Sequence, residues 1–133
     1  MPKPTEYTIE QLKALERDGW SEETFQGKVL EMAKGYGWKA VHFLPAMTGR
    51  IGKNGKPHVR TPYRGDGGGF PDTIAIHMRM ELGLAWELKV KNNRSTPEQM
   101  TWLDCFRSTG FDAGTFYPRD WDSMMDFLDK GKR

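Results

Sequence analysis

Apolar residues recur along this chain with two different spacings, and each spacing predicts one kind of secondary structure. Four segments repeat apolar residues every three or four positions, as amphipathic helices do: 8–18, 21–36, 96–108 and the residues after Asp120. Four shorter segments have the composition and alternation of strands: 38–44, 72–80, 84–90 and 113–117. The order is helix, helix, strand, loop, strand, strand, helix, strand, helix, which predicts one α/β domain over residues 1–133.

Capping residues mark the starts of three helices. Thr8 with Gln11 and Thr96 with Gln99 have the spacing of a capping box, in which a hydroxyl and a side-chain amide each bind a free backbone group. Ser21 can cap the second helix through its hydroxyl. We therefore expect these helices to begin directly after these residues.

The strands at 72–80 and 84–90 are expected to pair with each other. Gly83 stands between them and suits a turn, so the segment predicts an antiparallel hairpin. The second strand alternates strictly, which places its large apolar side chains on one face and Glu87 and Lys89 on the other.

Three polar residues of this hairpin have the chemistry of a metal-assisted phosphate site. Asp72 follows Pro71 at the start of one strand, and if the strands pair, Asp72 and Glu87 can share a hard divalent cation such as Mg²⁺ or Mn²⁺. Lys89 would orient a nucleophilic water or neutralise charge in the transition state. This pattern predicts phosphodiester hydrolysis. The alternative is a solvated strand face beside an ordinary Pro-Asp turn.

Residues of two helices can complete this site. Glu22 and Gln26 lie one helical turn apart, so Glu22 could join the metal shell while Gln26 and Gln99 steady the water or the phosphate. The alternatives are an acid favoured by the helix dipole for Glu22 and a purely structural capping box for Gln99. His42, on the strand at 38–44, could also face the site or serve the structure alone.

The segment 45–69 is a basic, glycine-rich loop. It holds seven glycines and a single acid, Asp66. Its five cations are candidate contacts to DNA phosphates: Arg50, Lys53, Lys56, Arg60 and Arg64. Asn54-Gly55 could turn a small hairpin within it. The alternative is a solvated insertion without a preferred partner.

Composition narrows the class of protein without deciding it. A net charge of +2 does not by itself indicate nucleic-acid binding. Cys105 is the single cysteine, which excludes an internal disulfide and a cysteine-based zinc site, and the three histidines are not clustered. No run approaches the roughly 18 apolar residues of a membrane span, and no signal peptide is recognisable, so we expect a cytoplasmic protein without membrane contact.

Short motifs stand along the chain in an order typical of one nuclease family. They are Ser-Glu-Glu-Thr-Phe-Gln at 21–26, Gly-Trp at 37–38, Val-His at 41–42, Gly-Phe-Pro-Asp at 69–72, Glu-Leu-Lys at 87–89, Thr-Pro-Glu-Gln-Met-Thr-Trp-Leu at 96–103 and Tyr-Pro-Arg-Asp-Trp-Asp at 117–122. Over roughly residues 21–130 the chain resembles a stand-alone VRR-NUC domain of the PD-(D/E)XK nuclease superfamily. The loop 45–69 is longer than that family pattern needs.

The resemblance implies a fold, an activity and a set of residues. It implies a restriction-endonuclease-like mixed β-sheet flanked by helices, with Glu22, Asp72 and Glu87 as ligands of Mg²⁺ or Mn²⁺, Lys89 as the catalytic lysine and Gln99 in support. It further implies a homodimer that cuts branched DNA, four-way (Holliday) junctions above all, in a bacterial or phage-infected cell. Residues 1–20 precede the resemblance and form a helical extension whose apolar stripe should pack on its own domain or on a partner subunit.

Other functions remain compatible with these residues. A nuclease for flaps, ends or ordinary duplex would use the same site with another substrate. A non-catalytic DNA-binding module on the same fold would be favoured if Asp72 and Glu87 were too far apart to share a metal ion. A structural or interaction protein would not need the basic loop or the polar strand face.

Overall fold

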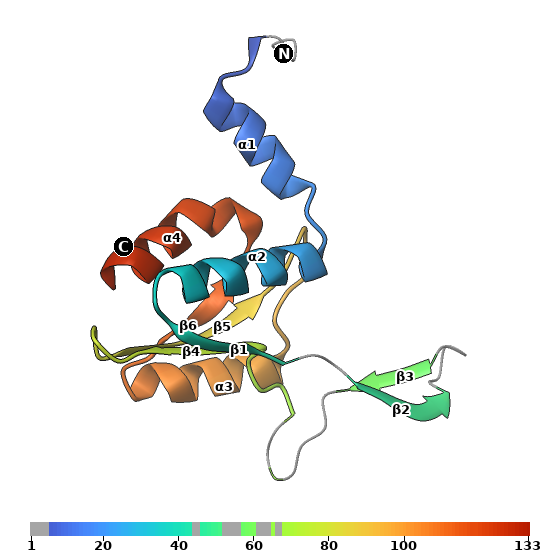
Figure 1. Cartoon of the computed structure of the whole chain (residues 1–133). Helices are drawn as coiled ribbons and strands as arrows, with labels where there is room; N and C mark the ends of the chain where they lie inside the picture. The colour runs from blue at the N-terminus through green and yellow to red at the C-terminus, as the bar shows by residue number, and fades with distance from the viewer. Residues whose placement is uncertain (1–5, 44–45, 52–56, 61–64, 66–67) are drawn as a thin grey trace.

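The computed structural model of the chain describes residues 6–43, 46–51, 57–60, 65 and 68–133, without the side chains of 46–51 and 57–60. The helices are α1 (Ile9–Asp18), α2 (Glu22–Gly35), α3 (Pro97–Ser108) and α4 (Trp121–Lys130), with a short 3-10 turn η2 (Pro118–Asp120) before α4. The strands are β1 (Lys39–His42), β2 (Ala46–Ile51), β3 (Pro57–Arg60), β4 (Thr73–His77), β5 (Leu82–Leu88) and β6 (Asp112–Phe116). Figure 1 shows their arrangement.

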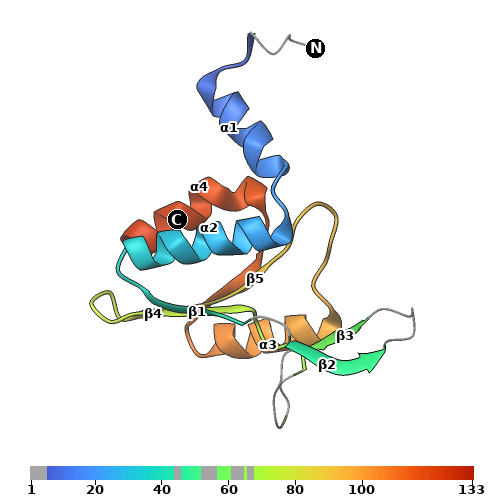
Figure 2. The ribbon, with the colours of Figure 1, turned by 45° about the vertical axis from the view of Figure 1, so that its right-hand side comes forward.

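A four-stranded mixed sheet forms the centre of the fold. Its strand order is β1-β4-β5-β6, in which β1, β4 and β5 pair antiparallel and β5 pairs with β6 in parallel. Helices α2 and α4 lie over one face of this sheet and α3 lies against the other (Figures 1 and 2). The mixed α/β fold predicted from the sequence is therefore confirmed.

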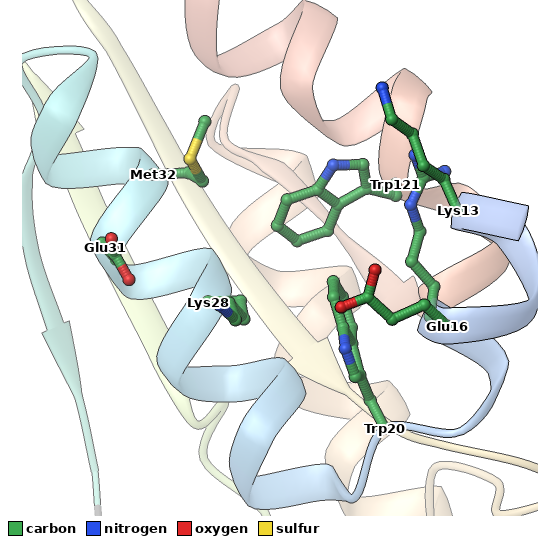
Figure 3. A pocket seen from close by; sticks show the side chains of 8 residues that line it. Lys13, Glu16, Trp20, Lys28, Glu31, Met32 and Trp121 are labelled. Carbon is green, nitrogen blue, oxygen red and sulfur yellow. The ribbon is translucent and has the colours of Figure 1, made fainter. Parts of the chain in front are cut away.

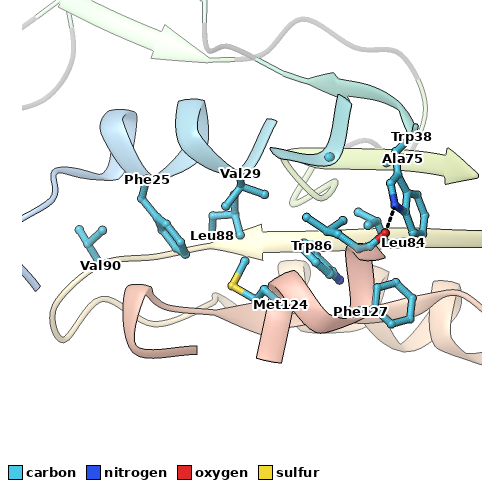
Figure 4. Packing of buried hydrophobic residues seen from close by; sticks show 12 residues of the cluster. Phe25, Val29, Trp38, Ala75, Leu84, Trp86, Leu88, Val90, Met124 and Phe127 are labelled. Carbon is cyan, nitrogen blue, oxygen red and sulfur yellow. Dashed lines mark hydrogen bonds between the residues drawn. The ribbon is translucent and has the colours of Figure 1, made fainter. Parts of the chain in front are cut away.

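The main hydrophobic core lies between the sheet and the α2–α4 layer. Phe25 and Val29 of α2, Trp86 of β5 and Met124 of α4 are all almost completely buried in one cluster (Figure 4). Each such side chain stabilises the fold by about 1.5–3 kcal/mol through burial alone. Trp38 also donates its ring N–H to the carbonyl of Leu128 at 2.9 Å, which ties the start of β1 to α4.

The helices begin where the capping residues predict. Thr8 and Gln11 form both hydrogen bonds of a capping box ahead of α1, and Thr96 and Gln99 do the same ahead of α3. The hydroxyl of Ser21 accepts the backbone N–H at the third position of α2. These three predictions are confirmed, and two of the caps bear directly on the site described below.

The turn of the β4–β5 hairpin lies earlier than the sequence predicts. β4 and β5 pair antiparallel as expected, but Gly83 lies inside β5, opposite Ile76. Glu81 takes the positive φ of the turn, at 55°. Glycine is needed at position 83 for a different reason, because a Cβ there would lie 2.6 Å from the ring of Phe111. The prediction of Gly83 as the turn residue is therefore wrong. A glycine is required at this position because the ring of Phe111 packs closely against it.

The loop 45–69 contains a small hairpin that stands apart from the main sheet. β2 and β3 pair antiparallel, with an irregular register between Met47 and Ile51. Figure 1 shows this hairpin beside the body of the domain. The proposed turn residues, Asn54 and Gly55, lie outside the described residues. The loop is therefore in part a regular element rather than a wholly irregular insertion.

Helix α1 projects from the body of the domain and buries none of its residues (Figures 1 and 2). Ile9, Leu12 and Leu15, its apolar stripe, are 71%, 48% and 51% exposed. An ion pair of 3.6 Å between Arg17 and Asp122 links its last turn to α4. The domain's described residues leave the stripe uncovered, and its packing on a partner subunit stays a prediction. No helix in the described part of the chain is long and apolar enough to cross a membrane.

Candidate active site

Asp72 is held at the point where the chain enters β4. Its Oδ2 accepts a hydrogen bond from the side-chain amide of Gln26 on α2, at 3.2 Å. The same oxygen lies 3.5 Å from the backbone N–H of Leu88 on β5, and Oδ1 accepts the hydroxyl of Thr73 at 3.2 Å. Two strands and one helix therefore fix this carboxylate in one position.

The glycine of the Gly-Phe-Pro-Asp motif brings this segment against the start of α3. Gly69 has φ +78°, and a Cβ at this position would lie 2.7 Å from the backbone nitrogen of Gln99 and the carbonyl carbon of Glu98. No other residue type fits such an approach to backbone without displacing it. Pro71 follows and is fully buried. The motif thereby holds the segment that leads into Asp72 against the N-terminus of α3, the helix that carries Gln99.

Glu87 is buried on the face of β5 opposite the main core, with only 3% of its surface exposed. Its Oε1 accepts the side-chain amide of Gln99 at 3.0 Å and lies 3.5 Å from the ammonium of Lys89. Its Oε2 is buried without a hydrogen-bond partner among the described residues. The solvated strand face considered for Glu87 is therefore excluded.

The carboxyl groups of Asp72 and Glu87 are directly coupled across β4 and β5. When Glu87 is protonated it donates a hydrogen bond to Asp72, which favours the protonated form of Glu87 and the ionised form of Asp72. When both are ionised they are two acceptors, and the second oxygen of Glu87 then has no donor. Asp72 and Glu87 therefore interact with each other, and a metal ion shared between them stays a prediction.

Burial disfavours the charged forms of both acids, and a neighbouring negative charge adds to this effect at each. Burial is the largest cause that raises the pKa of Asp72 to about 6, and the charge of Glu22 adds to it. Burial also raises the pKa of Glu87 to about 8, followed by the charge of Asp72, while the Lys89 ammonium acts in the opposite direction. At neutral pH the Asp72–Glu87 pair therefore retains a proton, mainly on Glu87.

A hard divalent cation fits this donor set. Two convergent carboxylates and a buried oxygen without a donor supply the oxygen ligands that Mg²⁺ and Mn²⁺ prefer. A cation bound there would offset the burial and the neighbouring negative charges that raise the two pKa values. Within the described residues no three His, Cys, Asp or Glu side chains gather as a metal-holding group. Asp72 and Glu87 are therefore the ligands that fit, with backbone oxygens or water to complete the shell.

Glu22 lies near this pair without joining it. It is half-buried at the first position of α2, and its charge acts on both Asp72 and His42. Glu23, the neighbouring acid, is exposed. Of the two acids at this helix start, Glu22 is the one whose charge acts on the site.

Each carboxylate is positioned by a glutamine from a different helix. Gln26 of α2 donates to Asp72, and Gln99 of α3 donates to Glu87. The oxygen of the Gln99 side chain meanwhile accepts the backbone N–H of Thr96 at 2.8 Å. The sequence left the capping box and the contact with the site as alternatives for Gln99. The structure shows that one side chain makes both hydrogen bonds.

Thr73 belongs to the site and was missed by the sequence reading. Its side chain is buried and donates to Asp72, and its oxygen lies 3.4 Å from Nδ1 of His42. Strand pairing explains this contact, because His42 of β1 stands opposite Thr73 of β4. Burial lowers the pKa of His42, against the opposing effects of the Asp72 backbone and the Glu22 charge. The signal available in the sequence was the hydroxyl next to the motif aspartate.

Two of the five predicted DNA-contacting cations lie on the small hairpin. Arg50 lies on β2 and Arg60 lies on β3. Lys53, Lys56 and Arg64 lie outside the described residues. The backbone of the hairpin is thus placed, and phosphate binding by these five residues stays a prediction.

A separate hollow of about 370 Å³ lies between α1, α2 and α4 (Figure 3). Trp20 and Trp121 meet edge to face at its wall, with ring centroids 5.2 Å apart, and charged residues of both signs surround them. None of the predicted site residues lines it. It is therefore distinct from the carboxylate pair.

A scan against protein-family models, a search of the curated proteins and a search of the solved structures each found no match to this chain. The resemblance to the VRR-NUC domain consequently rests on the motifs themselves. The class defined by the fold and the site is a mixed α/β domain with a buried pair of acids.

Proposed function

We propose that this protein is a metal-dependent endodeoxyribonuclease of the VRR-NUC type, with a restriction-endonuclease-like arrangement of its sheet. One observation carries the proposal: Asp72 and Glu87 converge in a buried position, Lys89 lies 3.5 Å from Glu87, and one carboxylate oxygen has no donor. When Glu87 is ionised, this oxygen has no donor among the described residues, and a bound cation would supply its missing partner.

The residues of the site would have different roles in phosphodiester hydrolysis. Bound Mg²⁺ or Mn²⁺ would supply electrophilic assistance to the phosphate and charge neutralisation at the leaving oxygen. Asp72 and Glu87 would hold it. The ammonium of Lys89, 16% exposed and fixed beside Glu87, would orient the attacking water and stabilise negative charge that develops on the phosphate. Gln26 and Gln99 keep both carboxylates in place before substrate arrives.

Branched DNA is the proposed substrate, cut in the manner of a Holliday-junction resolvase by a homodimer. Support for this substrate comes from the sequence motifs and from the basic loop 45–69, which directly precedes Phe70, Pro71 and Asp72 in the sequence. Two equivalent sites related by a two-fold axis would match the symmetry of a four-way junction.

A non-catalytic DNA-binding module is the second candidate. It is favoured by one observation, that no third acidic or histidine ligand joins Asp72 and Glu87 among the described residues. Such a module would have the same fold and basic loop, but Asp72 and Glu87 would only stabilise the fold. A flap, end or duplex nuclease would differ only in substrate.

The deciding experiment incubates labelled four-way junction, flap, linear duplex and single-stranded DNA with the protein in Mg²⁺, Mn²⁺ or EDTA. Glu87→Ala is the test variant, and Glu81→Ala, at an exposed acid in the β4–β5 turn, is its matched control. We expect metal-dependent, symmetric cutting of the junction that Glu87→Ala loses and Glu81→Ala keeps. Cutting of flaps or of all duplexes would change the substrate but keep the chemistry. Binding without cutting under every metal would favour the DNA-binding module.

A further inference from the structure

Two aromatic side chains lie exposed immediately beside the candidate active site. Phe43, directly after β1, and Phe70, directly before Pro71, are 36% and 37% exposed. Their rings meet edge to face, with centroids 5.6 Å apart and an interplanar angle of 80°. The two adjoining rings, each about one-third exposed, form a small apolar patch beside the carboxylate pair.

Both rings are tied rigidly to the catalytic carboxylate. The backbone N–H of Phe43 donates to the carbonyl of Asp72 at 2.8 Å, and Phe70 precedes Asp72 by two residues. Phe70 also packs edge to face against Trp102 and Phe106 of α3, at 4.9 and 5.7 Å. The two rings therefore occupy a fixed place relative to the site rather than moving as free side chains.

The same two residues flank the basic loop 45–69 in the sequence. Phe43 stands two residues before the segment 45–69 begins, and Phe70 follows its last residue. Aromatic rings next to a run of cations are the combination that holds unstacked nucleic acid, since bases stack on the rings while the cations attract phosphates. The segment that these two residues flank carries five cations and one acid, a charge that is complementary to the phosphates of nucleic acid, so the neighbourhood favours a nucleobase.

We infer that Phe43 and Phe70 form a stacking platform for an unpaired or unstacked nucleobase beside the phosphate to be cut. The inference rests on the proposed nuclease function and deepens it. It makes the platform a determinant of substrate choice: DNA that offers a free base at a branch or flap gains a contact, and continuous duplex does not.

The test is a binding experiment in EDTA, so that cleavage plays no part. Fluorescence anisotropy measures the affinity for a labelled flap DNA, for the same flap with an abasic residue at the unpaired position next to the branch, and for linear duplex. The variants are Phe43→Leu and Phe70→Leu. Phe111→Leu is the matched control, because Phe111 packs on Phe106 at 5.1 Å at the far end of the same cluster.

We expect each platform variant, and the abasic residue, to weaken flap binding roughly tenfold, with no further loss when both are combined. Binding to linear duplex should change less than twofold, and Phe111→Leu should bind every DNA as the unaltered protein does. An abasic residue without effect would overturn the platform while leaving the nuclease proposal intact. Failure to bind any DNA would overturn both. Weaker self-association in sedimentation, with unchanged flap affinity, would assign the rings to a protein interface and overturn the inference as well.

Discussion

Gln99 donates its side-chain amide to Glu87 at 3.0 Å while the oxygen of the same amide closes the capping box of α3. The start of a helix and the orientation of a buried acid therefore depend on one residue. A helix cap is normally interchangeable with other caps, but this one must also present an N–H group. Mutation can test separately the two functions of the Gln99 side chain, which are to cap α3 and to donate a hydrogen bond to Glu87.

Gln99→Glu should preserve the cap and damage the site. Glutamate at this position can still accept the N–H of Thr96, but it would place a third carboxylate beside Glu87 and remove the donor. We expect a loss of about 1–3 kcal/mol of unfolding free energy at pH 8 and a smaller loss at pH 6, where carboxyl protonation relieves the repulsion. Urea unfolding at the two pH values measures it.

Gln99→Ala and Gln11→Ala form the matched pair for this prediction. Both remove a capping box, but the box of Gln11 is exposed on α1 and far along the chain from the acids. Gln11→Ala should lower stability by about 0.5–2 kcal/mol; Gln99→Ala should lower it further, because it also removes the donor to the buried Glu87, and it alone should reduce DNA cleavage. Equal stability losses with equal, undiminished cleavage would show that Gln99 is only a cap.

Glu87→Gln should stabilise the metal-free protein at alkaline pH. The pKa of Glu87 is raised from 4.5 to about 8 in the folded state, so between these pH values the folded protein holds a proton that the unfolded chain has released. The stability that this group contributes is present below about pH 4.5 and is lost as pH rises to about 8. In EDTA, the advantage of Glu87→Gln over the unaltered protein should grow by at least about 1 kcal/mol from pH 5 to pH 8.

Glu81→Gln controls for the removal of an acid in general. Glu81 lies exposed in the turn that joins β4 to β5. Its variant should differ from the unaltered protein by a constant amount over this pH range. A constant difference for Glu87→Gln as well would contradict the buried, coupled pair.

Divalent cations should stabilise the folded protein, and more so as pH rises toward 8. Cation binding requires both acids in the ionised form, so the apparent affinity for Mg²⁺ should increase through the range in which Asp72 and Glu87 lose their protons, about pH 6 to pH 8. At a hundredfold excess over Kd the gain is about 2.7 kcal/mol. Thermal melts with Mg²⁺ or EDTA measure it, and a Tm insensitive to Mg²⁺, or equally raised in Glu87→Gln, would speak against this site.

Much of the fold and the centre of the site follow from local patterns. The caps at Thr8 and Thr96 are short-range signals with a direct physical cause, and they set the helix starts correctly. The pairing of Asp72 with Glu87 follows from one hairpin, so it could be predicted too. Thr73 and the true role of Gly83 could not, because both depend on contacts made by distant segments: β1 for the hydroxyl and Phe111 for the glycine.

Lys89→Met should abolish catalysis while the protein stays folded. The ammonium lies 3.5 Å from Glu87, where it would stabilise developing charge, so its loss should lower the cleavage rate at least about a hundredfold. Lys91→Met is the matched control, because Lys91 is exposed two residues further along. Single-turnover cleavage with saturating enzyme separates this effect from binding. Equal, small effects of both variants would assign Lys89 to surface charge alone.

Gly69→Ala should lower the free energy of unfolding and, at the same time, disturb the geometry of the site. Gly65 and Gly69 share a φ of +78°, so alanine strains the backbone equally at both positions. Only at position 69 would the new Cβ also meet backbone, 2.7 Å from Gln99, whereas no described atom lies within 4 Å of the corresponding point at Gly65. The added clash must push α3 away from the segment that carries Asp72, and Gln99 moves with it. We therefore expect Gly65→Ala to cost about 1 kcal/mol with cleavage retained, and Gly69→Ala to cost clearly more and to lose cleavage. Matching losses in urea unfolding and in cleavage would mean that the close approach does not hold the site together.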